Sequence, residues 1–263
     1  MPLEGSVAVA VERQAGARLR LGVPVTLLVV AGAGWWWSFR MADDMPGVMD
    51  PSMADMAMGH SLSLLAFTVA WVAMMAAMMF PAISPVVRLY GLAAAKGRVA
   101  PLPFFVAAYL AVWGAMAVPS YVAWQRLEAP IAGGASWAGR LAGGVLLTAA
   151  VWQLSPLKSV CLRHCRSPLS FFMQYGSGAA RRFGAFRMGA AHGLFCLGCC
   201  SALMAVLVAM GTMNLAWMAV LTGLIFLEKT APSGERIAVV GAAALACTGV
   251  LLLLRPALIT TLT

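Results

Sequence analysis

The sequence predicts an all-α fold, a polytopic bundle of about seven transmembrane helices, and two observations support this prediction. Hydrophobic residues make up 62% of the 263 residues and charged residues only 10%, too few to cover a soluble domain. Long uncharged apolar runs recur along the chain, and runs of this length are typical of helices that cross a bilayer. We expect residues 1–263 to form a single integral membrane domain, multi-pass in a bacterial inner (cytoplasmic) membrane and in contact with its lipids.

The seven apolar runs define the expected spans. The first, 21–39, ends in three tryptophans that resemble an interfacial belt. The remaining spans are expected at 62–83, 102–124, 139–154, 186–210, 215–227 and 235–254. Pro81 is expected to kink or end the second of them, because proline lacks the backbone N–H that a helix interior requires.

The distribution of positive charge predicts the orientation. If the N-terminus is inside, most of the Lys and Arg residues lie in cytoplasmic segments, as the positive-inside rule requires, and the C-terminus is outside. The net charge of +9 is then explained by basic residues in the cytoplasmic loops between spans. We therefore expect no nucleic-acid partner.

The loop at 40–61 is rich in methionine and is expected on the extracytoplasmic side. Thioethers stay competent as ligands in oxidising compartments and are soft enough for Cu(I), while imidazole can assist with Cu(II). The candidate outer capture residues are Met45, Met49, Met53, Met56, Met58 and His60. The alternative is a short amphipathic helix whose methionines pack on the membrane face.

Methionine is also concentrated near the inner end of the second span, in the run WVAMMAAMMFPA. At helical spacing the four thioethers occupy two adjoining faces of one helix. We predict that a metal is held by Met74, Met75, Met78 and Met79. The alternative is that these side chains only fill the core, because methionine is apolar and adaptable.

The segment 155–187 is a basic loop that we expect on the cytoplasmic side, with one amphipathic helix. It contains Cys161, His164 and Cys165, and the two cysteines share a face if the segment is helical. The nearby cations are expected to favour the thiolate forms. These three residues are candidate ligands of a second soft site at the inner surface. The alternative is a pair of ordinary thiols in a helix that binds anionic headgroups.

The fifth span contains the densest set of soft ligands, in HGLFCLGCCSALM. His192, Cys196 and Cys199 follow the spacing i, i+4, i+7, which places them within about 60° of one another on a helix. Cys200 and Met204 lie on the adjoining stripe. Ionisable groups inside a bilayer are costly, so this cluster predicts a metal site. The second span runs inward and the fifth outward, so their ligands are expected at similar depths.

The chain resembles a family of bacterial membrane proteins described as predicted metal-binding integral membrane proteins, domain of unknown function 2182. The resemblance rests on WVAMMAAMMFPA, SPLKSVCLRHCRSP, HGLFCLGCCSALM and GTMNLAWM followed by LEK, and it covers about residues 60–235. It implies metal binding but no particular reaction. Where the family commonly has a tryptophan after the paired cysteines, this chain has Ser201.

These observations predict a copper-handling membrane protein. The ion is expected to be Cu(I), with Zn²⁺ as the alternative, and the role metal uptake, delivery or homeostasis, which includes transport and needs no catalytic residue. A metallochaperone or a larger membrane complex is the expected partner. Two other hypotheses stay open at this point: a membrane thiol–disulfide redox protein, and a structural or assembly subunit of a larger complex.

Overall fold

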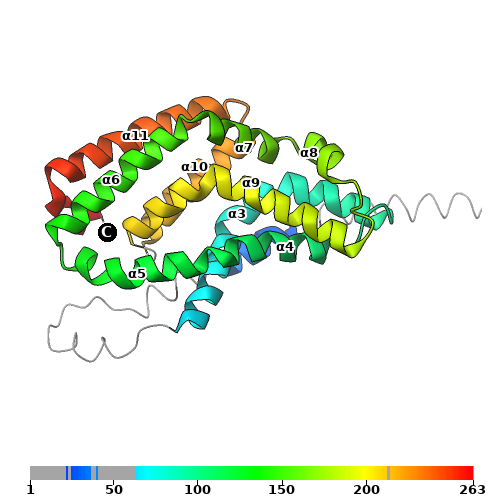
Figure 1. Cartoon of the computed structure of the whole chain (residues 1–263), viewed down its shortest axis with the longest axis horizontal. Coiled ribbons are helices and arrows are strands. Elements are labelled where there is room, and N and C mark those ends of the chain that lie inside the picture. Colours follow the sequence, from blue (N-terminus) through cyan, green and yellow to red (C-terminus); the bar gives the residue numbers. More distant parts are fainter. Residues whose placement is uncertain (1–21, 23–24, 37–39, 41–62, 212–213, 263) are drawn as a thin grey trace, which may run out of the picture.

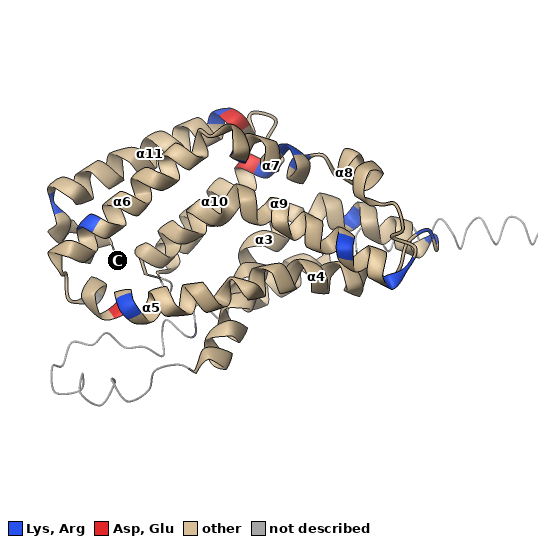
Figure 2. Ribbon diagram, in the orientation of Figure 1, with Lys and Arg blue, Asp and Glu red and all other residues tan. Residues whose placement is uncertain are grey.

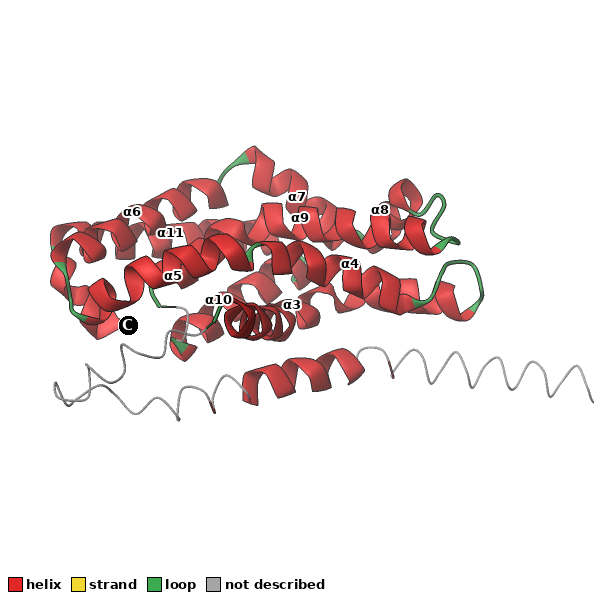
Figure 3. Cartoon of the chain, turned by 60° about the horizontal axis from the view of Figure 1, so that its bottom comes forward, coloured by secondary structure: helices red, strands yellow, loops and turns green. Residues whose placement is uncertain are grey.

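The computed structural model describes residues 22, 25–36, 40, 63–211 and 214–262 (Figure 1). Every regular element in this part of the chain is a helix, as Figure 3 shows, so the predicted all-α fold is confirmed. The predicted Met-rich loop 40–61 lies outside the described residues apart from Arg40. Its candidate capture residues therefore stay predictions.

The helices follow one another with short connections. An apolar helix, Val25–Trp36, precedes α3 (Leu64–Ala95), α4 (Leu102–Ala115), α5 (Ala117–Ala132), α6 (Ser136–Gln153), α7 (Pro156–Arg166), α8 (Pro168–Tyr175), α9 (Arg182–Ala209), α10 (Leu215–Thr230), α11 (Gly234–Leu254) and α12 (Ile259–Leu262). A short 3₁₀ turn, Pro256–Leu258, joins the last two.

Four of the described helical stretches are long and apolar enough to cross a membrane. They are 64–95, 102–131, 182–209 and 234–254, and a fifth results if α6 and α7, which meet at an angle of 66°, are taken as one bent span. The predicted spans at 21–39 and 215–227 correspond to shorter apolar helices, Val25–Trp36 and α10. The count of seven spans and the N-in, C-out orientation stay predictions.

The helix α3 continues past the proline that was expected to kink or end the second span. Both Pro81 and Pro85 lie inside it, and the helix runs on to Ala95. Pro85 has no N–H to donate to the carbonyl of Pro81, four residues earlier. The hydroxyl of Ser84 donates to that carbonyl instead, at 2.9 Å. This local substitution satisfies the freed acceptor, and the apolar surface of α3 can remain packed.

The predicted basic loop 155–187 is largely helical. It forms two helices, α7 and α8, where one amphipathic helix was expected. The side chain of Ser155 accepts a hydrogen bond from the N–H of Lys158 and caps α7, and Pro156 occupies the first turn, where its missing N–H costs nothing. The sequence Ser-Pro therefore starts a new helix at a sharp corner after α6.

Two close helix pairs organise the bundle. Helices α6 and α11 lie side by side along one edge, α4 and α9 lie side by side along another, and α10 lies between the pairs (Figure 1). Small residues permit these close approaches. A Cβ at Gly189 would collide with the backbone of Phe105 on α4, and a Cβ at Gly143 would lie 2.8 Å from the carbonyl oxygen of Gly249 on α11.

We expect Gly189→Ala to destabilise the protein by about 1–3 kcal/mol, because the added methyl group must push α4 away from α9. The matched control is Gly144→Ala on α6, where a Cβ meets nothing within 4 Å. There the better helix propensity of alanine is expected to leave stability unchanged or slightly raised. Thermal unfolding of the purified protein in detergent measures both variants. Equal melting temperatures for the two would contradict the close packing of α4 on α9.

Charged residues lie mainly at helix ends and in the connecting turns (Figure 2). Among the described charged residues, Lys158, Glu228 and Lys229 are buried, where the start of α7 meets the end of α10. Buried charges are costly unless they are paired or bind a ligand. Buried charges are therefore concentrated at the C-terminal end of α10, inside an otherwise apolar bundle.

Candidate metal centre

Three cysteines on α9 form a compact sulfur cluster. The Sγ atoms of Cys196, Cys199 and Cys200 all lie within 4.8 Å of one another, and those of Cys199 and Cys200 are 3.3 Å apart. All three side chains are at most 2% exposed. The spacing i, i+3, i+4 on one helix places them on the same side of α9. We call Cys196, Cys199 and Cys200 the sulfur cluster.

Two further sulfur atoms reach the sulfur cluster from other helices. Cys165 on α7 places its Sγ 3.9 Å from the Sγ of Cys199, and Met79 on α3 places its Sδ 4.0 Å from the Sγ of Cys196. Both side chains are buried. The contact of Met79 with Cys196 joins the second and fifth predicted spans, which the sequence placed at similar depths without showing that they are neighbours. Soft ligands from three helices therefore converge.

Cys196 has two polar neighbours in addition to sulfur. The ammonium group of Lys229 on α10 donates to its Sγ at 3.0 Å, and the hydroxyl of Tyr109 on α4 lies 3.1 Å from the same atom. Lys229 is 6% exposed and Tyr109 is fully buried. A cation and a hydroxyl beside one thiol stabilise its thiolate, which is the form that binds metals.

A second buried polar group lies next to this contact. The carboxylate of Glu228 accepts hydrogen bonds from Lys158 on α7 at 2.6 Å and from Gln153 on α6 at 2.7 Å. The ion pair is almost inaccessible to water, with 1% and 3% of the two side chains exposed. Since Glu228 and Lys229 are consecutive, this ion pair lies directly beside the contact of Lys229 with Cys196, without itself contacting sulfur.

His192 lies one helical turn before Cys196 and is fully buried. Neither of its ring nitrogens has a hydrogen-bond partner among the described residues. The rings of Phe105, Tyr109 and Phe171 surround it, with centroids 5.0–6.0 Å away. Buried polar atoms without partners are rare because each costs about 1–3 kcal/mol. An imidazole in this position is suited to a ligand that protein atoms do not supply.

The other predicted methionine ligands are buried as well. Met75, Met78 and Met79 are not exposed at all, and Met74 and Met204 are at most 8% exposed. All five therefore point into the helix bundle. The sulfur of Met79 contacts Cys196 of the sulfur cluster. The ligand role of the others stays a prediction.

The three residues expected to form a second site on the cytoplasmic side do not gather in one place. Cys165 joins the sulfur cluster. The ring of His164 stacks on Phe195 at 4.3 Å, and its Nδ1 lies 2.9 Å from the carbonyl oxygen of Val160. Cys161 packs against α9 where Gly198 leaves room, since a Cβ there would be 2.6 Å from its Sγ. Adjacent residues of a helix differ in direction by 100°, so His164 cannot follow Cys165 inward.

The cations of the basic loop are also arranged differently from the expectation. Lys158 is paired with Glu228, Arg163 donates to the carbonyl of Ser159, and Arg166 donates to the carbonyls of Ala231 and Pro232. The cation in contact with a cysteine is Lys229, from a different segment. The sequence analysis gave Lys229 no role and placed it just beyond the predicted span 215–227. The signal that could have revealed it is the pair of charged residues, Glu228 and Lys229, directly after an apolar run.

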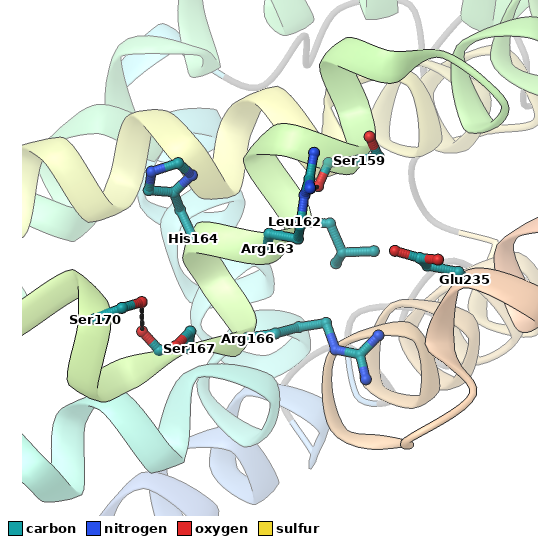
Figure 4. A pocket seen from close by; sticks show the side chains of 8 residues that line it. All are labelled: Ser159, Leu162, Arg163, His164, Arg166, Ser167, Ser170 and Glu235. Carbon is teal, nitrogen blue, oxygen red and sulfur yellow. Dashed lines mark hydrogen bonds between the residues drawn. The ribbon is translucent and has the colours of Figure 1, made fainter.

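A pocket of about 420 Å³ lies on the opposite side of α7 (Figure 4). Its lining includes several charged side chains, and Figure 4 shows Arg163, His164, Arg166 and Glu235 at its wall. No cysteine lines it. The pocket is therefore separate from the sulfur cluster, which is enclosed by α3, α4, α7 and α10 around α9.

The donor set fits a soft metal ion. Thiolate ligands suit Cu(I) and other soft ions, the added thioether favours Cu(I), and an enclosed apolar surrounding restricts access of water. Four cysteine sulfurs are also a set that Zn²⁺ accepts, in tetrahedral geometry. All six cysteines are free thiols, and Cys247, on α11, is exposed.

Comparison with known proteins identifies one family. A family model described as PpoB2, copper chaperone, matches residues 68–252, a range that includes the sulfur cluster, Met79, Cys165 and Lys229. No curated protein and no solved structure matches the chain significantly.

Proposed function

The chain belongs to the PpoB2 copper chaperone family, and from this premise we propose that it is an integral membrane protein that binds Cu(I) and delivers it to a partner. The apolar helices that are long enough to span a bilayer support a position in a membrane. The proposal places it in the bacterial inner membrane. Membership in the domain of unknown function 2182 family stays a prediction.

The observation that supports copper most directly is the convergence of sulfur on Cys196. Cys199 and Cys200 come from the same helix, Met79 from α3, and Cys165 approaches through Cys199. Cu(I) is stable with two or three soft ligands, so a set with one or two ligands to spare can pass the ion onward by ligand exchange. The same site can then both bind the copper ion and release it to a partner.

His192 and the methionines near it are proposed as auxiliary ligands. The unpartnered imidazole of His192 is one turn from Cys196, and the buried thioethers of α3 are on the helix that supplies Met79. They extend the soft lining beyond the sulfur cluster. Movement of copper along this lining, and hence uptake through the membrane, remains part of the proposal.

The experiment is metal analysis of the full chain purified from copper-supplemented cells under anaerobic conditions. We expect about one copper ion per chain in the wild type and almost none in the variant with Cys196, Cys199 and Cys200 changed to Ser. Cys247→Ser is the matched control, because this exposed cysteine lies on α11 and is not in the cluster. It should retain wild-type copper. Equal copper in wild type and triple variant would overturn the proposal.

A thiol–disulfide redox function is the second candidate, and the 3.9 Å separation of Cys165 and Cys199 favours it, since a small shift would bring their sulfurs to bonding distance. It predicts a reversible disulfide and no bound metal in the same preparation. Bound zinc without copper would instead favour a structural or assembly role.

A further inference from the structure

We infer that Lys229 makes the sulfur cluster selective for a monovalent soft cation over a divalent one. This inference rests on the proposed function, because it assigns a charge class to the ion that the sulfur cluster binds. It concerns a residue that is itself no ligand, since an ammonium group has no lone pair to offer.

The position of the ammonium group is the first step. Its nitrogen lies 3.0 Å from the Sγ of Cys196, the atom that also contacts Met79 and Tyr109. A metal bound to that sulfur sits about 2.3 Å from it. The ammonium nitrogen is therefore at most about 5 Å from any ion that Cys196 binds.

The surroundings of Lys229 are the second step. The neighbouring carboxylate of Glu228 is occupied by Lys158 and Gln153, and no described carboxylate contacts Lys229. The side chain is 6% exposed, so water screens its charge only weakly. The cysteine sulfurs are the counter-charge of this cation.

The third step is the charge of the bound ion, which determines how strongly Lys229 stabilises the complex. With the same set of thiolates, a complex of a divalent ion is less negative by one unit than a complex of Cu(I), so the ammonium group stabilises it less. One unit of charge at about 5 Å in a partly buried site corresponds to a selectivity on the order of a hundredfold. A general thiolate-stabilising effect of Lys229 applies to both ions and cancels in the ratio of their affinities.

The test compares Cu(I) and Zn²⁺ affinities of the full chain in detergent, each measured by competition with a chelator of known affinity. The variants are Lys229→Met and Lys229→Gln, which remove the charge, and Lys229→Arg, which keeps it. We expect the ratio of Cu(I) to Zn²⁺ affinity to fall about a hundredfold in the first two and to stay within about threefold of wild type in the third.

The control is the double variant Lys158→Met/Glu228→Gln, which removes a buried ion pair that does not contact sulfur. Its affinity ratio should match the wild type even where its stability does not. An unchanged ratio in both Lys229→Met and Lys229→Gln, with Cu(I) still bound, would overturn the inference and leave the proposed function standing. A wild type that binds no Cu(I) would overturn both.

Discussion

Replacing Cys196 with serine is expected to weaken Cu(I) binding more than any other single substitution among the cysteines. Its Sγ is the atom at which Met79, Tyr109 and Lys229 meet, and it belongs to the triplet with Cys199 and Cys200. A hydroxyl of nearly the same size keeps the packing but is a poor ligand for a soft ion. Loss of partners that only orient ligands costs about 10–100-fold in metal affinity, so loss of this ligand should exceed a hundredfold.

The measurement is a competition titration with a Cu(I) chelator under reducing conditions, on the purified full chain. Cys161→Ser is the informative control, since Cys161 shares a face of α7 with Cys165 but packs against Gly198. Its affinity should stay within a few-fold of wild type, whereas Cys165→Ser should show an intermediate loss. If Cys161→Ser and Cys196→Ser were equally damaging, Cys161 would have to be a ligand as well, and the assignment of the site to Cys196, Cys199 and Cys200 would be wrong.

The largest expected effect on stability comes from Glu228→Gln. The substitution leaves the buried ammonium group of Lys158 without a counter-ion, because the carboxylate of Glu228 is its partner at 2.6 Å. Breaking a buried ion pair by removing one charge costs about 3–5 kcal/mol, most of it the penalty for the unpaired charge that remains. We therefore expect a clear drop in the melting temperature, measured by thermal unfolding in detergent.

The double variant Lys158→Met/Glu228→Gln removes both charges and should recover much of that loss, because an apolar replacement avoids the desolvation penalty. The exposed residue Glu235, near the start of α11, provides the surface control: Glu235→Gln should change stability by less than about 1 kcal/mol. A double variant less stable than Glu228→Gln would show that the pair contributes more than it costs to bury.

The fold class was predictable because composition and apolar run length decide it. Predicted and observed boundaries agree within one residue at both ends of α11, where the apolar run is bounded by Glu235 and Arg255, and at the C-terminal end of α9, where Gly211 follows. They differ for α3, where Ser84 compensates for Pro85 and the helix continues. That compensation depends on one hydroxyl and is not visible in a hydropathy pattern.

The candidate site was predictable only within single helices. The spacing of Cys196, Cys199 and Cys200 on α9 gave the sulfur cluster, since helical periodicity places them together. The approach of Lys229 and Tyr109 to Cys196 depends on how α10 and α4 pack around α9, and no local pattern encodes it. Cys165 was assigned to a separate site because the corner between α6 and α7 could not be inferred from spacing.

The corner between α6 and α7 connects the position of α7 with the number of sulfur atoms available to a bound ion. Helix α7 meets α6 at 66° across Leu154 and Ser155, and it contributes both Cys165 and Lys158 to the interior. A swing of α7 about the corner would withdraw the thiol and the ammonium group in the same movement. An ion at the sulfur cluster would then lose the sulfur of Cys165 whenever the ion pair between Lys158 and Glu228 broke. The affinity for the ion would therefore depend on whether α7 is docked.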